Sequence, residues 1–160
     1  MSAAPFDDRD GSIWLDGSLI EYRDAKLHVL SHGLHYASAV FEGERLYNGS
    51  IFKSQEHTER LLNSANVVGY EIPYKAEEIE KAKLQVIEAM GLVDGYIRPI
   101  AWRGTEMMGV SAQQNTIHLA ITDWDWPYYF DPDAKTKGIN LALSKWRRPA
   151  PDTAPTNSKA

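Results

Sequence analysis

Polar and apolar residues alternate in short runs near the start of the chain, which is the pattern of β-strands. The run SIWLDGSLIEY, residues 12–22, contains two such segments on either side of a DG dipeptide, which is typical of tight hairpin turns. The run VFEGERLYNGSIFK, residues 40–53, repeats this arrangement around NG. The pattern therefore predicts two β-hairpins.

Apolar residues then recur every three or four positions, which is the period of an α-helix. We expect one helix to begin with Ser54 as its N-cap and to end at Gly69. Glu56 would lie in its first turn, where a negative charge suits the helix dipole. A second helix is expected over residues 76–90, with Gly91 as its C-cap.

Extended patterns return after the helices. Residues 96–102 and 116–122 predict strands, and INLALSKW at 139–146 predicts another. The intervening text DWPYYFDPDAKTKG is rich in proline, aspartate and aromatic residues and has no period, as linkers do. A lone strand followed by a proline-rich loop cannot bury its faces, so we expect its sheet partners to lie outside this sequence.

These patterns divide the chain into three parts. We expect a small N-terminal α+β domain over residues 1–129, an interdomain linker over residues 130–138, and the start of a larger, truncated domain over residues 139–160. A chain of 160 residues is long enough for one domain and the beginning of another.

The composition excludes several classes of protein. The chain has no cysteine, which excludes disulfides, thiolate metal sites and cysteine nucleophiles. Its net charge of −5 argues against a nucleic-acid surface, which is usually basic. No apolar run reaches transmembrane length, and the acidic start MSAAPFDDRDG lacks the apolar segment of a secretory signal. We expect a cytoplasmic protein that binds neither membrane nor nucleic acid.

Two arginines are candidates for binding an anion. Arg60 lies at the edge of the apolar stripe of the first helix, where it would either pair with Glu56 one turn away or present its planar guanidinium to a phosphate. Arg98 shares one face of its predicted strand with Tyr96. It suits a carboxylate ligand if that face lines a pocket, and it means little if that face is exposed. The pattern leaves both alternatives open.

Other residue types give weaker signals. His32 and His35 would share one face of a helix, but no third metal ligand follows at a recognisable spacing, and a polar turn before a buried strand explains them better. Four aromatic residues near the linker would either wall an apolar pocket or seal a domain interface: Trp124, Trp126, Tyr128 and Tyr129. Nothing in spacing or periodicity distinguishes Lys159 from the other lysines.

Four segments taken together, in this order, resemble the class IV aminotransferases and, within them, the branched-chain amino-acid aminotransferases. They are LSHGLHYASAVFEGER, FKSQEHTERLLNSA, YIRPI with the later MGV, and SKWRRPAPDTAPTNSKA. They cover nearly the whole chain after residue 12. The resemblance implies the small N-terminal domain of a fold-type IV enzyme, with an antiparallel-rich sheet and about two helices, followed by the first strand of a second domain.

The resemblance also implies a chemistry. The cofactor would be pyridoxal 5'-phosphate, and the reaction would be transamination between leucine, isoleucine or valine and 2-oxoglutarate, as in branched-chain amino-acid biosynthesis. The catalytic lysine that binds the cofactor covalently and then transfers protons corresponds to Lys159. The arginine that binds the cofactor phosphate corresponds to Arg60. The substrate-binding positions correspond to Tyr36, Phe41, Gly43, Tyr96, Arg98, Trp126 and Tyr129.

Within that pocket, we assign Arg98, Tyr36 and Tyr129 to the end that receives the side-chain carboxylate of glutamate. Glu44 stands where relatives also carry an apolar residue, which leaves the detail of the pocket open. The sequence stops one residue after Lys159, before the family's acid for the pyridine nitrogen and most of its phosphate cup. We therefore expect the 160 residues alone to be inactive and the parent protein to be the enzyme.

The resemblance leaves other interpretations open. Another class IV enzyme, a D-amino-acid aminotransferase or an aminodeoxychorismate lyase, is the nearest alternative, and a non-catalytic fragment is a second. A homo-oligomer is expected by analogy, because the family pairs its subunits around the active sites.

Overall fold

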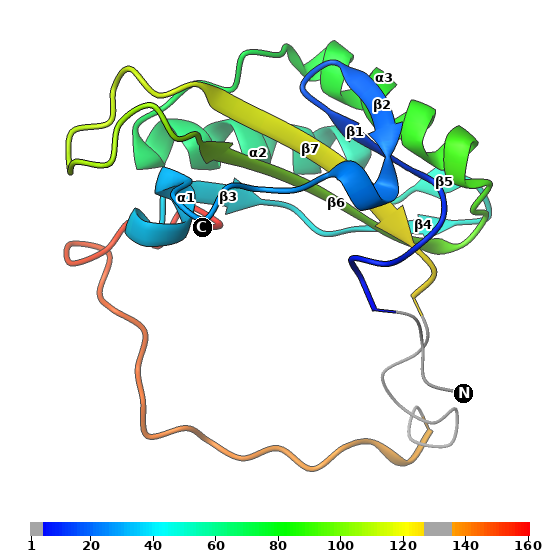
Figure 1. Ribbon diagram of the computed structural model, residues 1–160. Helices are drawn as coiled ribbons and strands as arrows, with labels where there is room; N and C mark the ends of the chain where they lie inside the picture. The colour runs from blue at the N-terminus through cyan, green and yellow to red at the C-terminus, as the bar shows by residue number, and fades with distance from the viewer. Residues whose placement is uncertain (1–4, 127–135) are drawn as a thin grey trace.

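The computed structural model describes residues 5–126 and 136–160, and in them an antiparallel sheet carries two long helices on one face (Figure 1). The strands are β1 Ser12–Leu15, β2 Ser18–Glu21, β3 Ala39–Phe41, β4 Glu44–Tyr47, β5 Ser50–Ile51, β6 Gly95–Arg103 and β7 Ile117–Trp124. The helices are α1 His32–Tyr36, α2 Ser54–Val68 and α3 Ala76–Met90, with a 3-10 turn, η1, at Tyr22–Asp24. The strand order is β2-β1-β7-β6-β4-β5, and β3 also pairs with β6. The expected α+β architecture is confirmed.

Both predicted hairpins form. β1 pairs with β2 around Asp16 and Gly17, whose φ angles are 47° and 107°. β4 pairs with β5 around Asn48 and Gly49, whose φ angles are 47° and 75°. Two consecutive residues with positive φ are what the tightest hairpin turns require, and Asp-Gly and Asn-Gly adopt them at low cost.

The two long helices form where the apolar period places them, with one correction at the start of α2. Lys53, not Ser54, occupies the N-cap, and Ser54 is the first helical residue. Its hydroxyl donates to Oε2 of Glu80 on α3 at 2.5 Å, so it joins the two helices instead of capping its own. The predicted ends hold, because α2 and α3 stop at Gly69 and Gly91 in the left-handed conformation.

The core lies between the helices and the sheet. Its large members are fully buried: Val40, Leu46, Ile97, Leu119 and Ile121 from the sheet, and Leu61, Ile79 and Val86 from the helices. Burial of each such side chain contributes about 1.5–3 kcal/mol before entropic costs. This packing holds α2 against β3, so that the polar face of α2 borders the sheet edge that follows β3.

The strand pairing along one side of β6 is interrupted at Glu42. Phe41 in β3 lies opposite Ile100, and Glu44 in β4 lies opposite Ile97. Between them the Glu42 N–H donates to the carbonyl of Pro99 at 2.9 Å, but Pro99 has no N–H to return the bond. The break therefore separates β3 from β4 and places Glu42 at the gap.

The strand predicted over residues 139–146 is absent. Residues 136–160 run apart from the sheet and return to it beside β3 (Figure 1). Leu141, Leu143 and Trp146 are 86%, 101% and 92% exposed. A strand needs a neighbour to satisfy its backbone groups, and no described strand runs beside this segment. The prediction is wrong for this reason.

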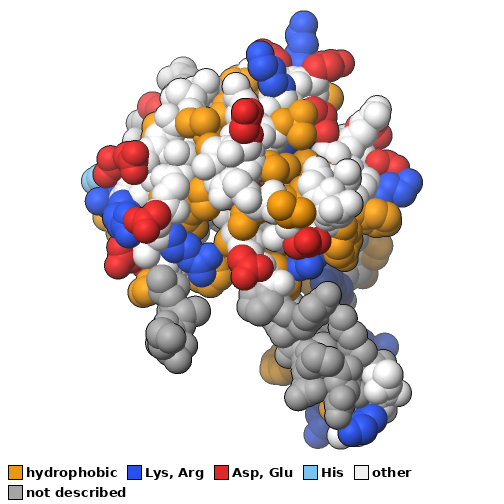
Figure 2. Space-filling view, turned by 90° about the vertical axis from the view of Figure 1, so that its right-hand side faces the viewer, with side chains coloured by type: hydrophobic (Ala, Val, Ile, Leu, Met, Phe, Trp, Pro, Cys, Tyr) orange, Lys and Arg blue, Asp and Glu red, His pale blue; other side chains and the backbone are white. Residues whose placement is uncertain are grey.

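The surface mixes both signs of charge. Figure 2 shows acidic and basic side chains interspersed at one end of the molecule, with apolar side chains between them. A separate set of apolar side chains is exposed on α1 and the segment before it: Leu27, Val29, Leu30, Leu34 and Tyr36. No helix within the described residues is long and apolar enough to cross a membrane.

Asp123 is an acid buried in β7. Its side chain is fully buried, and neither carboxylate oxygen has a hydrogen-bond partner among the described residues. Burial raises its pKa from 3.8 to about 7. A carboxyl group with a raised pKa favours the folded state while it is protonated, and this contribution is lost as the pH rises from about 4 through 7.

We therefore expect Asp123→Val to raise the free energy of unfolding by about 2–4 kcal/mol at pH 8 and by less at pH 4. Urea denaturation of the protein at the two pH values measures the difference. Asp125→Asn, two residues away and exposed, is the control and should change little at either pH. An equal gain from Asp123→Val at both pH values would assign the effect to strand propensity and not to the buried charge.

Candidate functional site

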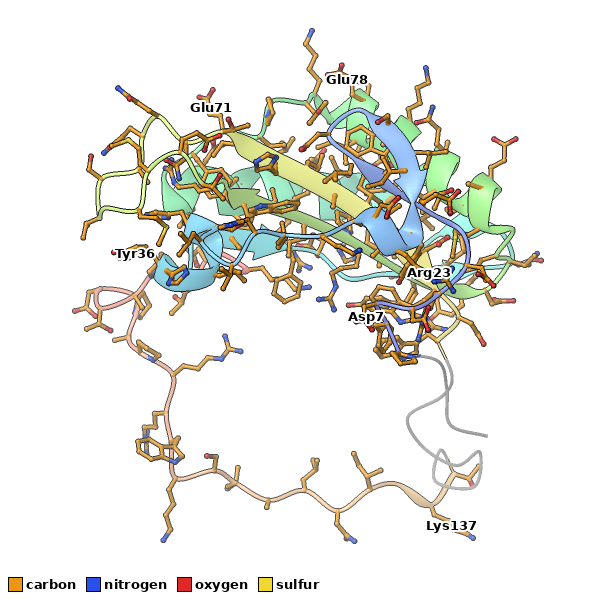
Figure 3. The ribbon with its side chains drawn as sticks, in the orientation of Figure 1. Asp7, Arg23, Tyr36, Glu71, Glu78 and Lys137 are labelled. Carbon is orange, nitrogen blue, oxygen red and sulfur yellow. The ribbon has the colours of Figure 1, made fainter. Side chains whose placement is uncertain are left out.

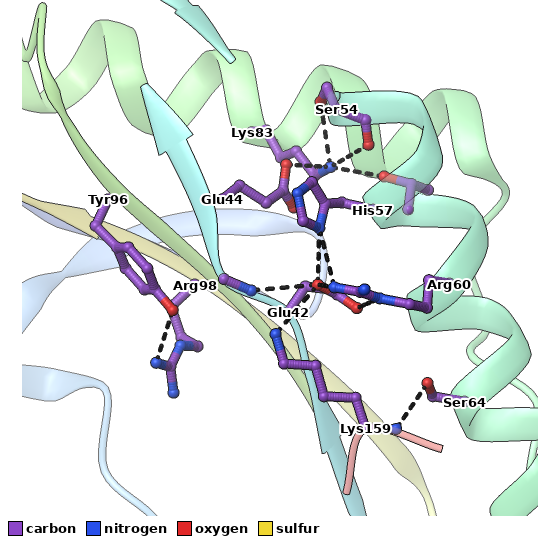
Figure 4. Close-up of polar contacts among 12 residues, drawn as sticks. Glu42, Glu44, Ser54, His57, Arg60, Ser64, Lys83, Tyr96, Arg98 and Lys159 are labelled. Carbon is purple, nitrogen blue, oxygen red and sulfur yellow. Dashed lines mark hydrogen bonds and ion pairs between the residues drawn. The ribbon is translucent and has the colours of Figure 1, made fainter. Parts of the chain in front are cut away.

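The buried carboxylate of Glu42 lies at the centre of a group of basic side chains (Figure 4). Arg60 on α2 donates to both of its oxygens, through Nε at 2.5 Å and Nη2 at 2.6 Å. Nδ1 of His57 lies 2.8 Å from Oε2 of Glu42, and Nζ of Lys159 lies 3.4 Å from the same oxygen. We call Glu42, His57, Arg60 and Lys159 the Glu42 cluster.

The cluster keeps Glu42 ionised and carries an excess of positive charge. Burial opposes ionisation of Glu42, but hydrogen bonds from Arg60 and His57 and the charge of Lys159 outweigh it and lower the pKa to about 2. The hydrogen bonds to Glu42 raise the pKa of Arg60 in turn. The one carboxylate of Glu42 therefore faces the basic groups of both Arg60 and Lys159, and the cluster favours the binding of an anion.

The backbone around Lys159 is held between the sheet and α2. The Phe41 N–H donates to the carbonyl of Lys159, and the Lys159 N–H donates to Oγ of Ser64, both at 3.0 Å. The Ser158 hydroxyl donates to the carbonyl of Ser64 at 3.0 Å. Lys159 is thus anchored within the cluster although it lies 95 residues from Ser64 in sequence.

Arg60 does not pair with Glu56, as one alternative expected. Glu56 pairs with Lys53 at 2.5 Å, and Arg60 turns to Glu42. The Arg60 side chain is 51% exposed, and its Nη1 has no hydrogen bond within the described residues. A cavity of about 290 Å³ is lined by Phe52, Lys53, Glu56, His57 and Arg60. One edge of the guanidinium is therefore available to an anion.

A second group lies on the helix-free face of the same strands. The guanidinium carbon of Arg98 lies 4.5 Å from the centre of the Phe41 ring, and its Nη2 donates to the Tyr96 hydroxyl at 3.0 Å. Nε of Arg98 is buried and has no hydrogen-bond partner among residues 5–126 and 136–160. Arg98 therefore packs against aromatic rings and is only partly exposed, and its binding of a carboxylate stays a prediction.

Aromatic rings and one glycine complete this second group. Tyr96 stacks on Trp126 with ring centres 4.6 Å apart and lies 4.9 Å from Trp124. A Cβ at Gly43 would lie 1.8 Å from the Tyr96 hydroxyl, so this position must lack a side chain for Tyr96 to occupy its place. The expectation for Tyr128 and Tyr129 lies outside the described residues.

Tyr36 lies apart from both groups. It projects from α1 at the edge of the molecule (Figure 3), is 46% exposed and stacks on His32 with ring centres 4.5 Å apart. His32 is buried, with Nδ1 2.7 Å from Oγ of Ser38 and Nε2 3.0 Å from the carbonyl of Gly109. The described residues contain no group of three or more acidic, histidine or cysteine side chains that could hold a metal ion.

Glu44 lies between the helices and the sheet, on the same side of the sheet as the Glu42 cluster. Its Oε2 accepts a hydrogen bond from the fully buried amine of Lys83 at 2.9 Å. Lys83 also donates to Oε1 of Glu80 at 2.9 Å and to Oγ1 of Thr58 at 2.6 Å. Burial raises the pKa of Glu44 to about 7 against the charge of Lys83. Glu44 thus belongs to a buried network with Lys83, Glu80 and Thr58.

The sequence pattern did not single out three residues of the site: Glu42, His57 and Ser64. Glu42 is an acid inside an apolar strand run, which is a signal in retrospect because buried acids need cationic partners. His57 lies one helical turn before Arg60, on the same face of α2. Ser64 gave no signal, since its role depends on the return of residue 159.

Comparison with known proteins places these residues in a family. The model of the family described as amino-transferase class IV matches residues 39–159. The branched-chain-amino-acid aminotransferase of Pseudomonas aeruginosa is 40% identical over 157 residues, which are 96% of this chain and 51% of that protein. The chain thus spans about half the length of the curated relatives it matches.

Solved structures of branched-chain aminotransferases have the same fold as this chain. The branched-chain amino acid aminotransferase of Escherichia coli superposes with a TM-score of 0.89 at 35% identity, over 94% of this chain and 51% of that one. The branched-chain aminotransferase of the thermophilic archaeon Thermoproteus uzoniensis, solved with norvaline, gives a TM-score of 0.84 at 36% identity, over 93% of this chain and 50% of that one.

Proposed function

The chain belongs to the class IV aminotransferases, and on this premise we propose that its full-length protein catalyses pyridoxal-phosphate-dependent transamination between branched-chain L-amino acids and 2-oxoglutarate. By full-length protein we mean a chain of its relatives' length that includes these residues. One observation carries the proposal. Lys159 is anchored beside Arg60, whose free guanidinium edge lies in a cluster with excess positive charge. An amine next to an anion site is what an aldehyde cofactor with a phosphate group requires.

The residues present fit this cofactor. Arg60 would bind its phosphate through the unused Nη1, and Lys159, whose side chain is 34% exposed, would bind it covalently. When bound, pyridoxal phosphate supplies the electron sink that stabilises a carbanion at the substrate Cα. Lys159 would then hold and transfer the proton at that carbon. Nearby Glu42 stays ionised and is therefore a counter-ion for the amine, not the base.

We propose the second group as the substrate pocket. Phe41, Tyr96 and Trp126 offer apolar surface to a branched side chain, and Gly43 leaves room between them. Arg98 would bind the side-chain carboxylate of glutamate in the second half-reaction, because a guanidinium supported by a hydroxyl and aromatic rings suits that charge. The roles of Tyr36 and Tyr129 at this end are part of the same proposal.

The wider assignments follow the same premise. We propose the domain division at residues 1–129, 130–138 and 139–160, and a cytoplasmic enzyme. We also propose a homo-oligomer. The exposed apolar side chains on α1 and the segment before it are a surface that a second subunit would cover.

The test is a substrate comparison with the full-length protein and pyridoxal phosphate. Formation of L-glutamate from 2-oxoglutarate is measured with L-leucine, L-isoleucine, L-valine and D-alanine as amino donors. We expect activity with the three L-amino acids and none with D-alanine. Activity with D-alanine alone would instead identify a D-amino-acid aminotransferase, and the absence of any transamination would contradict the proposal.

The variant Arg98→Gln tests whether Arg98 binds the side-chain carboxylate of glutamate in the proposed substrate pocket. It should reduce kcat/KM for glutamate about 10- to 100-fold more than kcat/KM for leucine, since a hydrogen-bonded charge pair is lost only with glutamate. Equal losses for both substrates would remove Arg98 from the carboxylate-binding role.

A further inference from the structure

We propose that Glu42 is a positioning residue. It holds the Arg60 guanidinium in the orientation in which its free edge can donate hydrogen bonds to a phosphate. The inference rests on the proposed function, because it concerns the group that Arg60 would bind. The donors around the buried carboxylate of Glu42 indicate this role, although the sequence pattern did not single out Glu42 (Figure 4).

The guanidinium has two hydrogen-bonding edges, and Glu42 occupies only one. The edge made of Nε and Nη2 binds Oε1 and Oε2 of Glu42 at 2.5 and 2.6 Å. The other edge includes Nη1, and this atom donates no hydrogen bond within the described residues. Such a two-point contact fixes the plane of the guanidinium as well as its position. The free edge therefore faces one fixed direction.

Glu42 is itself a rigid anchor. Its side chain is 0% exposed, and its backbone N–H is bonded to Pro99 at the gap between β3 and β4. An unrestrained arginine at a half-exposed helix position samples many rotamers, and a phosphate would have to select one of them. Binding to Glu42 removes that cost before the phosphate arrives.

The same carboxylate also relates Arg60 to Lys159. Oε2 accepts from Nη2 of Arg60 and lies 3.4 Å from Nζ of Lys159. His57 occupies the same oxygen at 2.8 Å, which further restrains it. Glu42 thus sets the separation between the group that would bind the phosphate and the amine that would bind the aldehyde.

The substitution Glu42→Gln separates a positioning role from a purely electrostatic one, because the two roles predict opposite changes in phosphate binding. A glutamine removes one negative charge from the cluster, which by electrostatics alone would strengthen the binding of a phosphate. It also replaces a two-oxygen acceptor by a single one, which releases one donor of Arg60 and frees its plane. A positioning role therefore predicts weaker phosphate binding despite the more positive site.

The experiment compares pyridoxal phosphate with pyridoxal, which lacks the phosphate. Dissociation constants for both are measured spectroscopically with the full-length protein and with Glu42→Gln, Arg60→Ala and the double variant. The ratio of the pyridoxal constant to the pyridoxal phosphate constant reports the phosphate contribution. We expect Glu42→Gln to reduce this ratio roughly tenfold, the lower end of what loss of a supporting partner costs at metal sites. In the Arg60→Ala background it should cause no further loss.

Each outcome decides one assignment. An unchanged or increased ratio in Glu42→Gln, while Arg60→Ala lowers it, would overturn the positioning role and leave the proposed function intact. An unchanged ratio in Arg60→Ala would remove the phosphate role of Arg60, and with it the basis for this inference.

Two further variants guard against misfolding. Glu42→Asp keeps the charge but shortens the side chain, so a reduced ratio there supports positioning and an unchanged ratio contradicts it, even if Glu42→Gln does not fold. Glu44→Gln is the matched control. Glu44 is equally buried and two residues away, but it binds Lys83 instead of Arg60, and its loss should leave the ratio unchanged.

Discussion

Lys159→Ala in the full-length protein is expected to reduce kcat/KM for L-leucine with 2-oxoglutarate by about 10⁴-fold, the upper range for a residue that transfers a proton in the transition state. The reason lies in the geometry. The backbone of Lys159 is bonded to Phe41 and Ser64, and these contacts place its amine beside the Glu42 cluster. The charge of that amine helps to lower the pKa of Glu42, as expected of a cation held within the cluster.

The measurement has a chemical arm and a kinetic arm. Borohydride reduction followed by peptide mass mapping should find the cofactor fixed on Lys159 in the unmodified protein and on no peptide in the variant. Lys145→Ala is the matched control, because Lys145 lies in the same segment, is exposed and should keep both activity and labelling. Full activity of Lys159→Ala, or labelling at another lysine, would refute the assignment.

Lys83→Met is expected to lower the free energy of unfolding by about 3–5 kcal/mol, the typical cost of breaking a buried ion pair by removal of one partner. Lys83 and Glu44 are both fully buried, and Lys83 also binds Glu80 and Thr58. Methionine fills a similar volume but leaves Glu44 without its cation. Lys83 joins α2, α3 and β4 in one network, so its loss should also loosen the start of α2.

Urea denaturation at pH 8 measures this loss, since Glu44, whose pKa is about 7 with Lys83 beside it, is then ionised in the unmodified protein. The double variant Lys83→Met/Glu44→Leu should recover much of the stability, because it removes the unpaired charge together with its partner. Lys81→Met, on the same helix, is a control for the change of side chain. A loss of less than about 1 kcal/mol in Lys83→Met would mean that Glu44 is neutral in the folded protein and that the pair contributes little.

The sequence by itself determined the local structure of this protein. The two hairpins follow from Asp16-Gly17 and Asn48-Gly49, because these residues accept positive φ at low cost. The two long helices follow from the apolar period, and their ends follow from Gly69 and Gly91. The ordered motifs also determined the family, because four segments in the same order are specific in a way that no single one is.

Only the tertiary structure decided which distant residues meet. Arg60 turns from its neighbour Glu56 to Glu42 because α2 packs against β3 next to the gap that Pro99 creates. Glu44 meets Lys83 on the same helix-covered face of the sheet, and Ser54 binds Glu80 because α3 packs against α2.

The strand expected over residues 139–146 fails for a related reason, since a strand exists only beside a partner. Periodicity describes the environment of a residue within its own element. The partner of a buried charge depends instead on how separate elements pack, and this is why Glu42 and Lys159 became part of one site only once the chain was folded.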